Sequence, residues 1–467
     1  MPADDSASVE PRAPWTRRRV LAAAGSLAGL GALGFGLRHR LIQRVAAVTQ
    51  LGSFTEAPSE PKHDPELDRT TIAVSRELGP AANVDHVLAK LGGIEAFVGK
   101  DDVVIVKLSA QWWNQGMTNV AAARRLIEQV LERPGFEGEV IVFENTHFRL
   151  PDGSGLSRAW VAESERNVDV AGWTKLGDLM PYFAGRQRAP VSFVGLVDAG
   201  PSALSGDAWH DPERRYGVYG GDERGPIPAG DPRDGYHWDF ERGFHLARSW
   251  VDEARTPLSW PRFTSPATGL VVDLRDGVRC REGGKLEPAG RKLSWINLTT
   301  ANEHAATGLT GACKSTMGVV DMSAGALGTH PLARGWASVH YFGRGSPSAS
   351  WRMAGPLAHF AREVRAPDLI LAVAEWVAFA PEGWDDERED RRHAAASCAQ
   401  KRCVVGGRDP VAIDAWIVRH LMAELPSAGR LRMLDLDEPD AMVTKFLRYY
   451  REVHGRGALD PALVQVV

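Results

Sequence analysis

The fold is decided by a stretch that reads VVIVKLS (Val103–Ser109), then VAAARRLIEQVLER (Val120–Arg133), then VIVFENTH (Val140–His147). Short apolar runs of this kind predict buried strands, and the middle segment places its apolar residues on one helical face. A strand, a helix and a strand at this spacing form a βαβ unit, which requires a parallel sheet with ligands at the carboxyl ends of its strands. Lys107 and His147 stand at two such ends. We expect both in a ligand site, with a helix cap or a solvated loop as the alternative for each.

Later runs repeat the pattern. In GRDPVAID (407–414), Pro410 fits the first turn of a helix and Asp409 its cap, while Asp414 lies where the helix dipole favours a carboxylate. A capping and a surface role are the alternatives for these two aspartates. The other elements are expected at 71–75, 270–274, 293–298, 368–374, 403–406 and 438–454. We predict an α/β fold of two units with mainly parallel sheets, at residues 69–200 and 267–467.

Residues 201–266 interrupt this pattern with Gly, Pro, Asp, Arg and aromatic residues and show little periodicity. A long irregular segment inside a domain is usually functional or disordered. Its six Trp, Tyr and Phe residues between 209 and 240 argue against full disorder. We interpret the segment as an irregular insertion or lid.

The N-terminus carries a targeting signal. Thr16–Leu21 (TRRRVL) resembles the twin-arginine export signal, and the apolar run 20–37 that follows would form a helix of about 27 Å, close to the thickness of a membrane core. We expect residues 1–44 to be a signal or a membrane anchor and 45–68 a linker. Cleavage and retention both stay open, as does a chance basic and apolar N-terminus. The expected partners are the twin-arginine translocation machinery and the membrane, and the expected location is periplasmic or anchored on the outer face.

Composition sets further limits. The 467 residues exceed one ordinary core, and 44% hydrophobic with 24% charged residues is typical of globular proteins. A net charge of −4, with basic residues spread along the chain, argues against nucleic acid as a partner. The four cysteines form no CxxC pair. Cys398 and Cys403 can form a disulfide or remain single buried thiols, and the sequence does not choose.

The best candidate for a site is residues 302–330, NEHAATGLTGACKSTMGVVDMSAGALGTH. Its small residues let a backbone approach a ligand closely. Three of its side chains can do chemistry: an imidazole at His304 or His330 can ligate a metal or move a proton, and Lys314 in a partly dry turn can be a nucleophile or a covalent tether. The alternative is a glycine-rich loop with an ordinary surface lysine.

Two of these segments resemble the domain-of-unknown-function 362 family: H-x-x-x-G-x-T-G-x-x-K-S-x-x-G (304–318) and GRDPVAID. The resemblance covers about residues 72–421, apart from the insertion. The family's Lys-Pro-Asn strand end is Lys107-Leu108-Ser109 here, its Gly-Pro element near Glu375 is missing, and its activity is not established. Besides Lys314, the residues expected to bind a cofactor are Lys107, Gly308, Gly311, Ser315, Asp409 and Asp414.

Residues 308–318 also resemble the segment that carries a nickel-pincer nucleotide in lactate racemases. That resemblance implies a cofactor attached to Lys314, nickel bound by His330, and acid or base roles for His147 and His304. The acidic-arginine signature of the racemases has no counterpart in this sequence, so the resemblance does not extend to 2-hydroxy acid binding.

The leading hypothesis is therefore an exported, cofactor- or metal-dependent enzyme of racemase or oxidoreductase type that acts on a small molecule. The alternative is a non-catalytic metal- or ligand-binding protein of the cell envelope. A scaffold that presents the aromatic insertion to a partner is a third hypothesis. An adduct on Lys314 would distinguish the first from the other two.

Overall fold

The computed structural model describes residues 68–145, 157–185, 188–196, 216–219, 235–246, 254–304, 307–321, 339, 351–379, 397–425 and 434–467. All of these belong to one compact unit, Phe54–Val467. The expected signal or anchor and the linker before residue 68 lie outside the described residues, as do His147 and His330. Within the described ranges, no helix is both long and apolar enough to cross a membrane.

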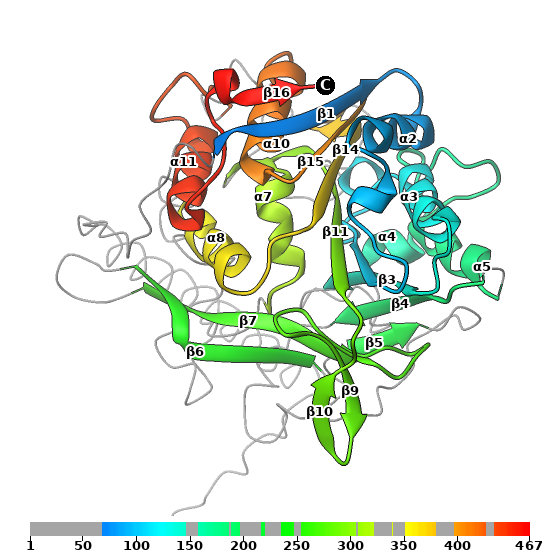
Figure 1. Cartoon of the computed structure of the whole chain (residues 1–467). Helices are drawn as coiled ribbons and strands as arrows, with labels where there is room; N and C mark the ends of the chain where they lie inside the picture. The colour runs from blue at the N-terminus through cyan, green and yellow to red at the C-terminus, as the bar shows by residue number, and fades with distance from the viewer. Residues whose placement is uncertain are drawn as a thin grey trace, which may run out of the picture. The chain divides into compact units, whose positions relative to one another are not determined.

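A mainly parallel sheet forms the centre of this unit (Figure 1). Its strands pair in the order β16 (Val464–Val466), β1 (Thr70–Arg76), β15 (Cys398–Gly407), β14 (Leu369–Ala378), β11 (Leu293–Thr300), β2 (Val103–Lys107), β3 (Glu139–Asn145), β4 (Val191–Leu196) and β5 (Tyr216–Tyr219). The strands from β14 to β4 are parallel, whereas β15 and β5 run against their neighbours. The predicted α/β class with a mainly parallel sheet is confirmed.

Strands from both expected α/β units share this sheet, because β11 pairs directly with β2. From β2 the chain adds β3 and then β4 toward one edge of the sheet. From β11 it adds β14 toward the opposite edge. The strand order therefore reverses between β2 and β11. In open parallel sheets, the crevice outside the carboxyl ends at such a reversal is the usual place for a ligand.

Both faces of the sheet are buried, which explains why its central strands read as continuous apolar runs. Val104 and Val106 of β2 belong to a cluster with α2 (Pro80–Lys90) and α3 (Val120–Glu132). Val103 and Ile105 point to the other face, which is covered by α7 (Ala312–Ser315), α8 (Ala354–Glu363), α10 (Pro410–Ile417) and α11 (Met442–His454). Figure 1 shows these two groups of helices apart from each other.

Local sequence explains where these helices begin and end. Asn119 caps α3, since its side chain accepts from the Ala122 N–H at 3.1 Å, and Asp409 caps α10 ahead of Pro410. Gly455, with φ of 88°, ends α11 in the left-handed conformation. The shorter helical segments are η2 (Ile94–Ala96), η3 (Asn114–Gly116), α4 (Arg158–Val161), η4 (Leu176–Asp178), α5 (Leu179–Phe183), η7 (Thr316–Gly318), η12 (Val418–Met422) and η13 (Pro461–Leu463).

An antiparallel second sheet packs against the face that carries Val103 and Ile105. Phe143 of β3 stacks on Phe263 of this sheet with ring centroids 5.8 Å apart, and Glu139 accepts a hydrogen bond from the Thr268 hydroxyl at 2.8 Å. The strands pair in the order β10 (Lys285–Pro288), β9 (Gly277–Glu282), β8 (Val271–Asp273), β7 (Ala254–Thr264) and β6 (Gly235–Leu246). A separate hairpin joins β12 (Asn302–His304) to β13 (Gly308–Thr310).

Strands β5, β6 and β7 lie within residues 201–266, the segment that we expected to be irregular. Its described parts are therefore regular sheet rather than loop. Large apolar residues do alternate along β6, at Tyr236, Trp238, Phe240, Phe244 and Leu246, so the two-residue period was present in the sequence and was missed. The pairing of β6 with β7 shifts register between Asp239 and Phe244.

Candidate functional site

The crevice at the strand reversal is rich in buried polar side chains. Lys107 ends β2 and lies beside Asn297 of β11 in the pairing register, and both are almost fully buried. Glu144 and Asn145, at the end of β3, are buried as well. Other buried polar residues at the carboxyl ends of these strands or just beyond them are Thr118, Thr299, Thr300, Asn302, Lys314, Ser315 and Glu375. Such a concentration of polar groups inside a core is costly unless they have partners.

The Lys107 amine lies against the backbone that follows α7. A Cβ added to Gly318 would stand 2.7 Å from Lys107 Cε and 3.0 Å from its Nζ. Any larger residue at position 318 would therefore displace the amine. Gly318, one of the motif glycines, makes room for the lysine of a distant strand.

Lys107 and Glu144 are both buried at the ends of neighbouring strands, and each influences the pKa of the other without a direct ion pair between them. Burial lowers the pKa of the Lys107 amine, and the charge of Glu144 opposes that change. Burial raises the pKa of the Glu144 carboxyl, and Lys107 together with the backbone amides of Ala110 and Gln111 opposes it. Both shifts favour the neutral amine and the neutral carboxyl, and they bring the pKa values of the two groups closer together. A proton can then move between the pair and a bound molecule near neutral pH.

Three polar atoms in this region have no hydrogen-bond partner among the described residues. Glu144 Oε1 accepts from the Ala110 N–H at 2.9 Å, but Oε2 has none. Glu375 Oε1 accepts from Gln400 at 2.9 Å while its Oε2 is likewise without a partner, and so is Asn297 Nδ2. Buried polar atoms are rarely left in this state. A ligand or water with its own polar groups would satisfy them.

Asn145 ties the crevice to the second sheet. Its amide donates to the Val320 carbonyl at 2.7 Å and to the Tyr236 hydroxyl of β6. Ser315 of α7 makes a second tie, since its hydroxyl donates to Asn297 Oδ1 at 2.7 Å. The crevice is thus held between the central sheet, α7 and β6.

The motif histidine and lysine sit in defined positions. His304 pairs with Gly308 in the hairpin, and Gly308 has φ of 77°, so the spacing H-x-x-x-G encodes a turn. The His304 ring lies 3.2 Å from the Thr307 hydroxyl. Lys314 is 9% exposed within α7 and is not the surface lysine that the alternative assumed. The catalytic role of His304 stays a prediction.

The two family-like segments meet through Asp414. Its carboxylate accepts hydrogen bonds from the Ala312 N–H at 2.6 Å and the Cys313 N–H at 2.9 Å, so it clamps the start of α7 to α10. A Cβ at Gly311 would stand 2.2 Å from Asp414 Oδ1. Burial is the largest cause that raises the pKa of Asp414 to about 7, and the two amides oppose it. Gly311 and Asp414 therefore hold the backbone of the site.

Asp409 lies at the other end of the sheet. Its Oδ1 accepts from the Val411 and Ala412 N–H groups, and its Oδ2 from the Ala458 N–H at 2.8 Å. Through these bonds the carboxylate caps α10. A capping role was one of the alternatives for the two aspartates. The surface alternative does not hold for Asp414, which is 1% exposed.

The structure thus brings Lys107, Ser315 and Gly318 together around Asn297, and places Asp409 elsewhere. Glu144, Asn145, Asn297 and Glu375 were absent from the predicted site. Their signal was available in part, because Glu144, Asn145 and Glu375 follow apolar runs, whereas Asn297 lies inside its strand. Within the described ranges, no group of three or more His, Cys, Asp or Glu side chains is arranged to hold a metal ion.

Comparison with known proteins identifies one matching family model. Residues 291–419 match the family model described as "Domain of unknown function (DUF362)". No curated protein matches the chain. A crystal structure of a protein from Thermotoga maritima is 15% identical with a TM-score of 0.30, over 66% of this chain and 54% of that chain. So low a TM-score supports no conclusion about fold or function, and this chain spans about half the length of that protein.

The clamp at Asp414 predicts a non-additive pair of substitutions. Gly311→Ala should lower the free energy of unfolding by roughly 1–3 kcal/mol, because the new methyl group overlaps the carboxylate. On an Asp414→Ala background the same change should cost much less, since the obstructing oxygen is gone. Urea unfolding of the four proteins measures the coupling. Strictly additive costs would show that the two residues do not meet.

The buried pair predicts opposite effects of pH on stability. The raised pKa of Glu144 makes the folded state keep a proton above pH 4.5 that the unfolded state releases, so stability falls as pH rises there. The lowered pKa of Lys107 makes the folded state lose a proton below pH 10.5 that the unfolded state retains, so stability rises with pH there. Glu144→Gln should make the falling limb shallower, and Lys107→Met should make the rising limb shallower.

Each substitution should reduce the slope of its limb by up to about 1.4 kcal/mol per pH unit, the value for one proton. Urea unfolding at a series of pH values measures this, with the exposed Lys285→Met as the matched control. If the free energy of unfolding of both variants depends on pH as it does in the unsubstituted protein, Lys107 and Glu144 are not desolvated.

Proposed function

We propose that this protein, whose residues 291–419 form a DUF362 domain, is an acid–base enzyme of racemase, epimerase or oxidoreductase type. Its substrate is a small polar molecule bound in the crevice beyond β2 and β11. The observation that carries the proposal is the burial of an amine, Lys107, and a carboxyl, Glu144, at the ends of the neighbouring strands β2 and β3 beside the strand reversal. Structural ion pairs also shift pKa values, but they do not normally leave a carboxylate oxygen without a partner at a ligand-binding edge.

The pair can remove and return a proton. In its neutral form, the Lys107 amine accepts a proton from a C–H or O–H group of the substrate and becomes an ammonium. The protonated Glu144 carboxyl donates its proton to the substrate and becomes a carboxylate. The resulting ammonium and carboxylate attract each other, which offsets the cost of charging both groups in a buried site. Asn297 Nδ2 offers a polar atom for orienting the substrate.

The nickel-pincer expectation depends on Lys314 and His330. Lys314 is a buried amine, as a covalent tether requires, whereas His330 lies outside the described residues. No step of the proposal passes through a metal, and the cofactor stays a prediction. The mass of the peptide that contains Lys314, taken together with elemental analysis, decides it: an unmodified peptide without nickel would end that expectation.

Deuterium exchange provides the test of the enzyme. The protein is incubated in D2O with a bacterial metabolite extract, and mass spectrometry follows molecules that gain deuterium or change their chirality. We expect at least one metabolite to change with the unsubstituted protein and with Lys285→Met, and at least a hundredfold slower change with Lys107→Met or Glu144→Gln.

Inversion of a stereocentre without deuterium uptake would indicate hydride transfer instead of proton transfer. If no metabolite changes while one of them raises the melting temperature, the non-catalytic ligand-binding alternative replaces the enzyme. That alternative is favoured by the same unpartnered polar atoms, which binding alone would satisfy.

Export through the twin-arginine route is the second part of the proposal, supported by residues 16–37 of the sequence. Replacing Arg17 and Arg18 together by Lys should retain the protein in the cytoplasm, because that signal is read through its arginine pair. Fractionation of cells followed by immunoblotting measures this. Equal amounts of both proteins outside the cytoplasm would exclude the route.

A further inference from the structure

A basic cleft lies at the amino ends of the parallel strands, away from the crevice. It consists of two adjoining cavities of about 570 and 480 Å3. Lys292 and Asp368, which come directly before β11 and β14, line the smaller one. The eight residues of β11 span about 26 Å at ~3.3 Å per residue, so cleft and crevice are separate places. The residues shared by both cavities are Arg69, Thr70, Ala96, Phe97 and Arg408.

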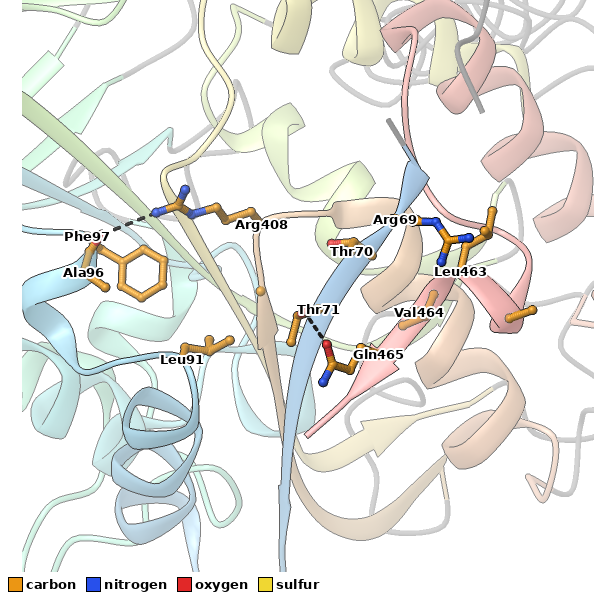
Figure 2. A pocket seen from close by; sticks show the side chains of 12 residues that line it. Arg69, Thr70, Thr71, Leu91, Ala96, Phe97, Arg408, Leu463, Val464 and Gln465 are labelled. Atoms are coloured by element: carbon orange, nitrogen blue, oxygen red, sulfur yellow. Dashed lines mark hydrogen bonds between the residues drawn. The ribbon is translucent and has the colours of Figure 1, made fainter. Parts of the chain in front are cut away.

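Four exposed cationic side chains line this cleft: Arg69 and Arg408 in both cavities, Lys292 and Arg456 in the smaller one. Across the described ranges, none of the four has a carboxylate within salt-bridge distance. Arg408 is held in place by other contacts: its guanidinium lies 5.1 Å from the Phe97 ring centroid and donates to the Ala96 carbonyl at 3.3 Å. Figure 2 shows Arg408 reaching toward Phe97, with Arg69 beyond Thr70.

The two aspartates of the cleft are engaged elsewhere. Asp368 accepts from the Trp295 N–H at 2.9 Å and from Arg365 at 3.0 Å. Asp409 is satisfied by the three backbone amides described above. The cleft therefore carries an excess of positive charge that no group within it neutralises.

The walls of the cleft add two more features. Leu91, Leu463 and Val464 give the larger cavity an apolar side beside its threonines (Figure 2). His454 of the smaller cavity is 8% exposed, and its Nδ1 has no hydrogen-bond partner. An anionic group therefore fits the smaller cavity, and a carbon skeleton fits the larger one.

We infer that the cleft binds a soluble small molecule through a phosphate group, which lies among Arg69, Lys292, Arg408 and Arg456. A phosphate carries about −1.5 to −2 charges at pH 7 and accepts several hydrogen bonds, so it can use more than one of the cations that line the smaller cavity. Arginine forks match phosphate oxygens in pairs. A single carboxylate would leave most of these cations uncompensated.

Calorimetric titration of the full chain tests this inference with pyrophosphate, adenosine monophosphate and adenosine as probes. We expect both phosphate probes to bind and adenosine not to bind. The double variant Lys292→Met/Arg408→Met should weaken phosphate binding at least about tenfold, as loss of hydrogen bonds to charged groups does. Lys285→Met, an exposed lysine on β10, should bind as the unsubstituted protein does.

Two results would overturn the inference: no saturable binding of either phosphate probe, or equal affinity in the double variant. Vesicles of phosphatidylglycerol and phosphatidylcholine distinguish the source of the phosphate. If the double variant loses vesicle binding while the unsubstituted protein binds neither soluble probe, the cleft recognises a lipid surface, and the small molecule is excluded. Because this cleft and the crevice share no residue, neither outcome bears on the enzyme proposal.

Discussion

The contact on which the site depends is the clamp between the Asp414 carboxylate and the first amides of α7. A helix of four residues has little stability of its own. Held to α10 at its start and to Asn297 through Ser315, it places the Gly318 backbone over the Lys107 amine. Three segments that are far apart in the chain are thereby fixed around one lysine.

The two ends of the central sheet differ in chemistry because they differ in solvent access. At the carboxyl ends, Lys107 and Glu144 are enclosed, so burial drives both toward neutral forms and makes them suited to proton transfer. At the amino ends, Arg69 and Arg408 remain exposed and charged, which suits recognition of an anion. The proposed acid–base site and the proposed anion site therefore lie in different electrostatic surroundings.

Prediction from the sequence succeeded where the signal is local. The βαβ unit, the cap Asp409 and the place of Lys107 at a strand end all follow from residues within a few positions of each other. It failed for β6, although large apolar residues alternate along that strand. Nothing local showed that the oxygens of Asp409 and Asp414 accept from backbone amides, and their role in binding a cofactor stays a prediction.

The sequence by itself determined the α/β class, because buried parallel strands and amphipathic helices leave different periods in the order of residues. Only the tertiary structure decided that Lys107 lies beside Asn297 and near Glu144, and that Gly318 makes room for it. The physical reason is that the order of strands in a sheet is set by the packing of segments nearly 200 residues apart. The period within each segment carries no information about which neighbour it will have.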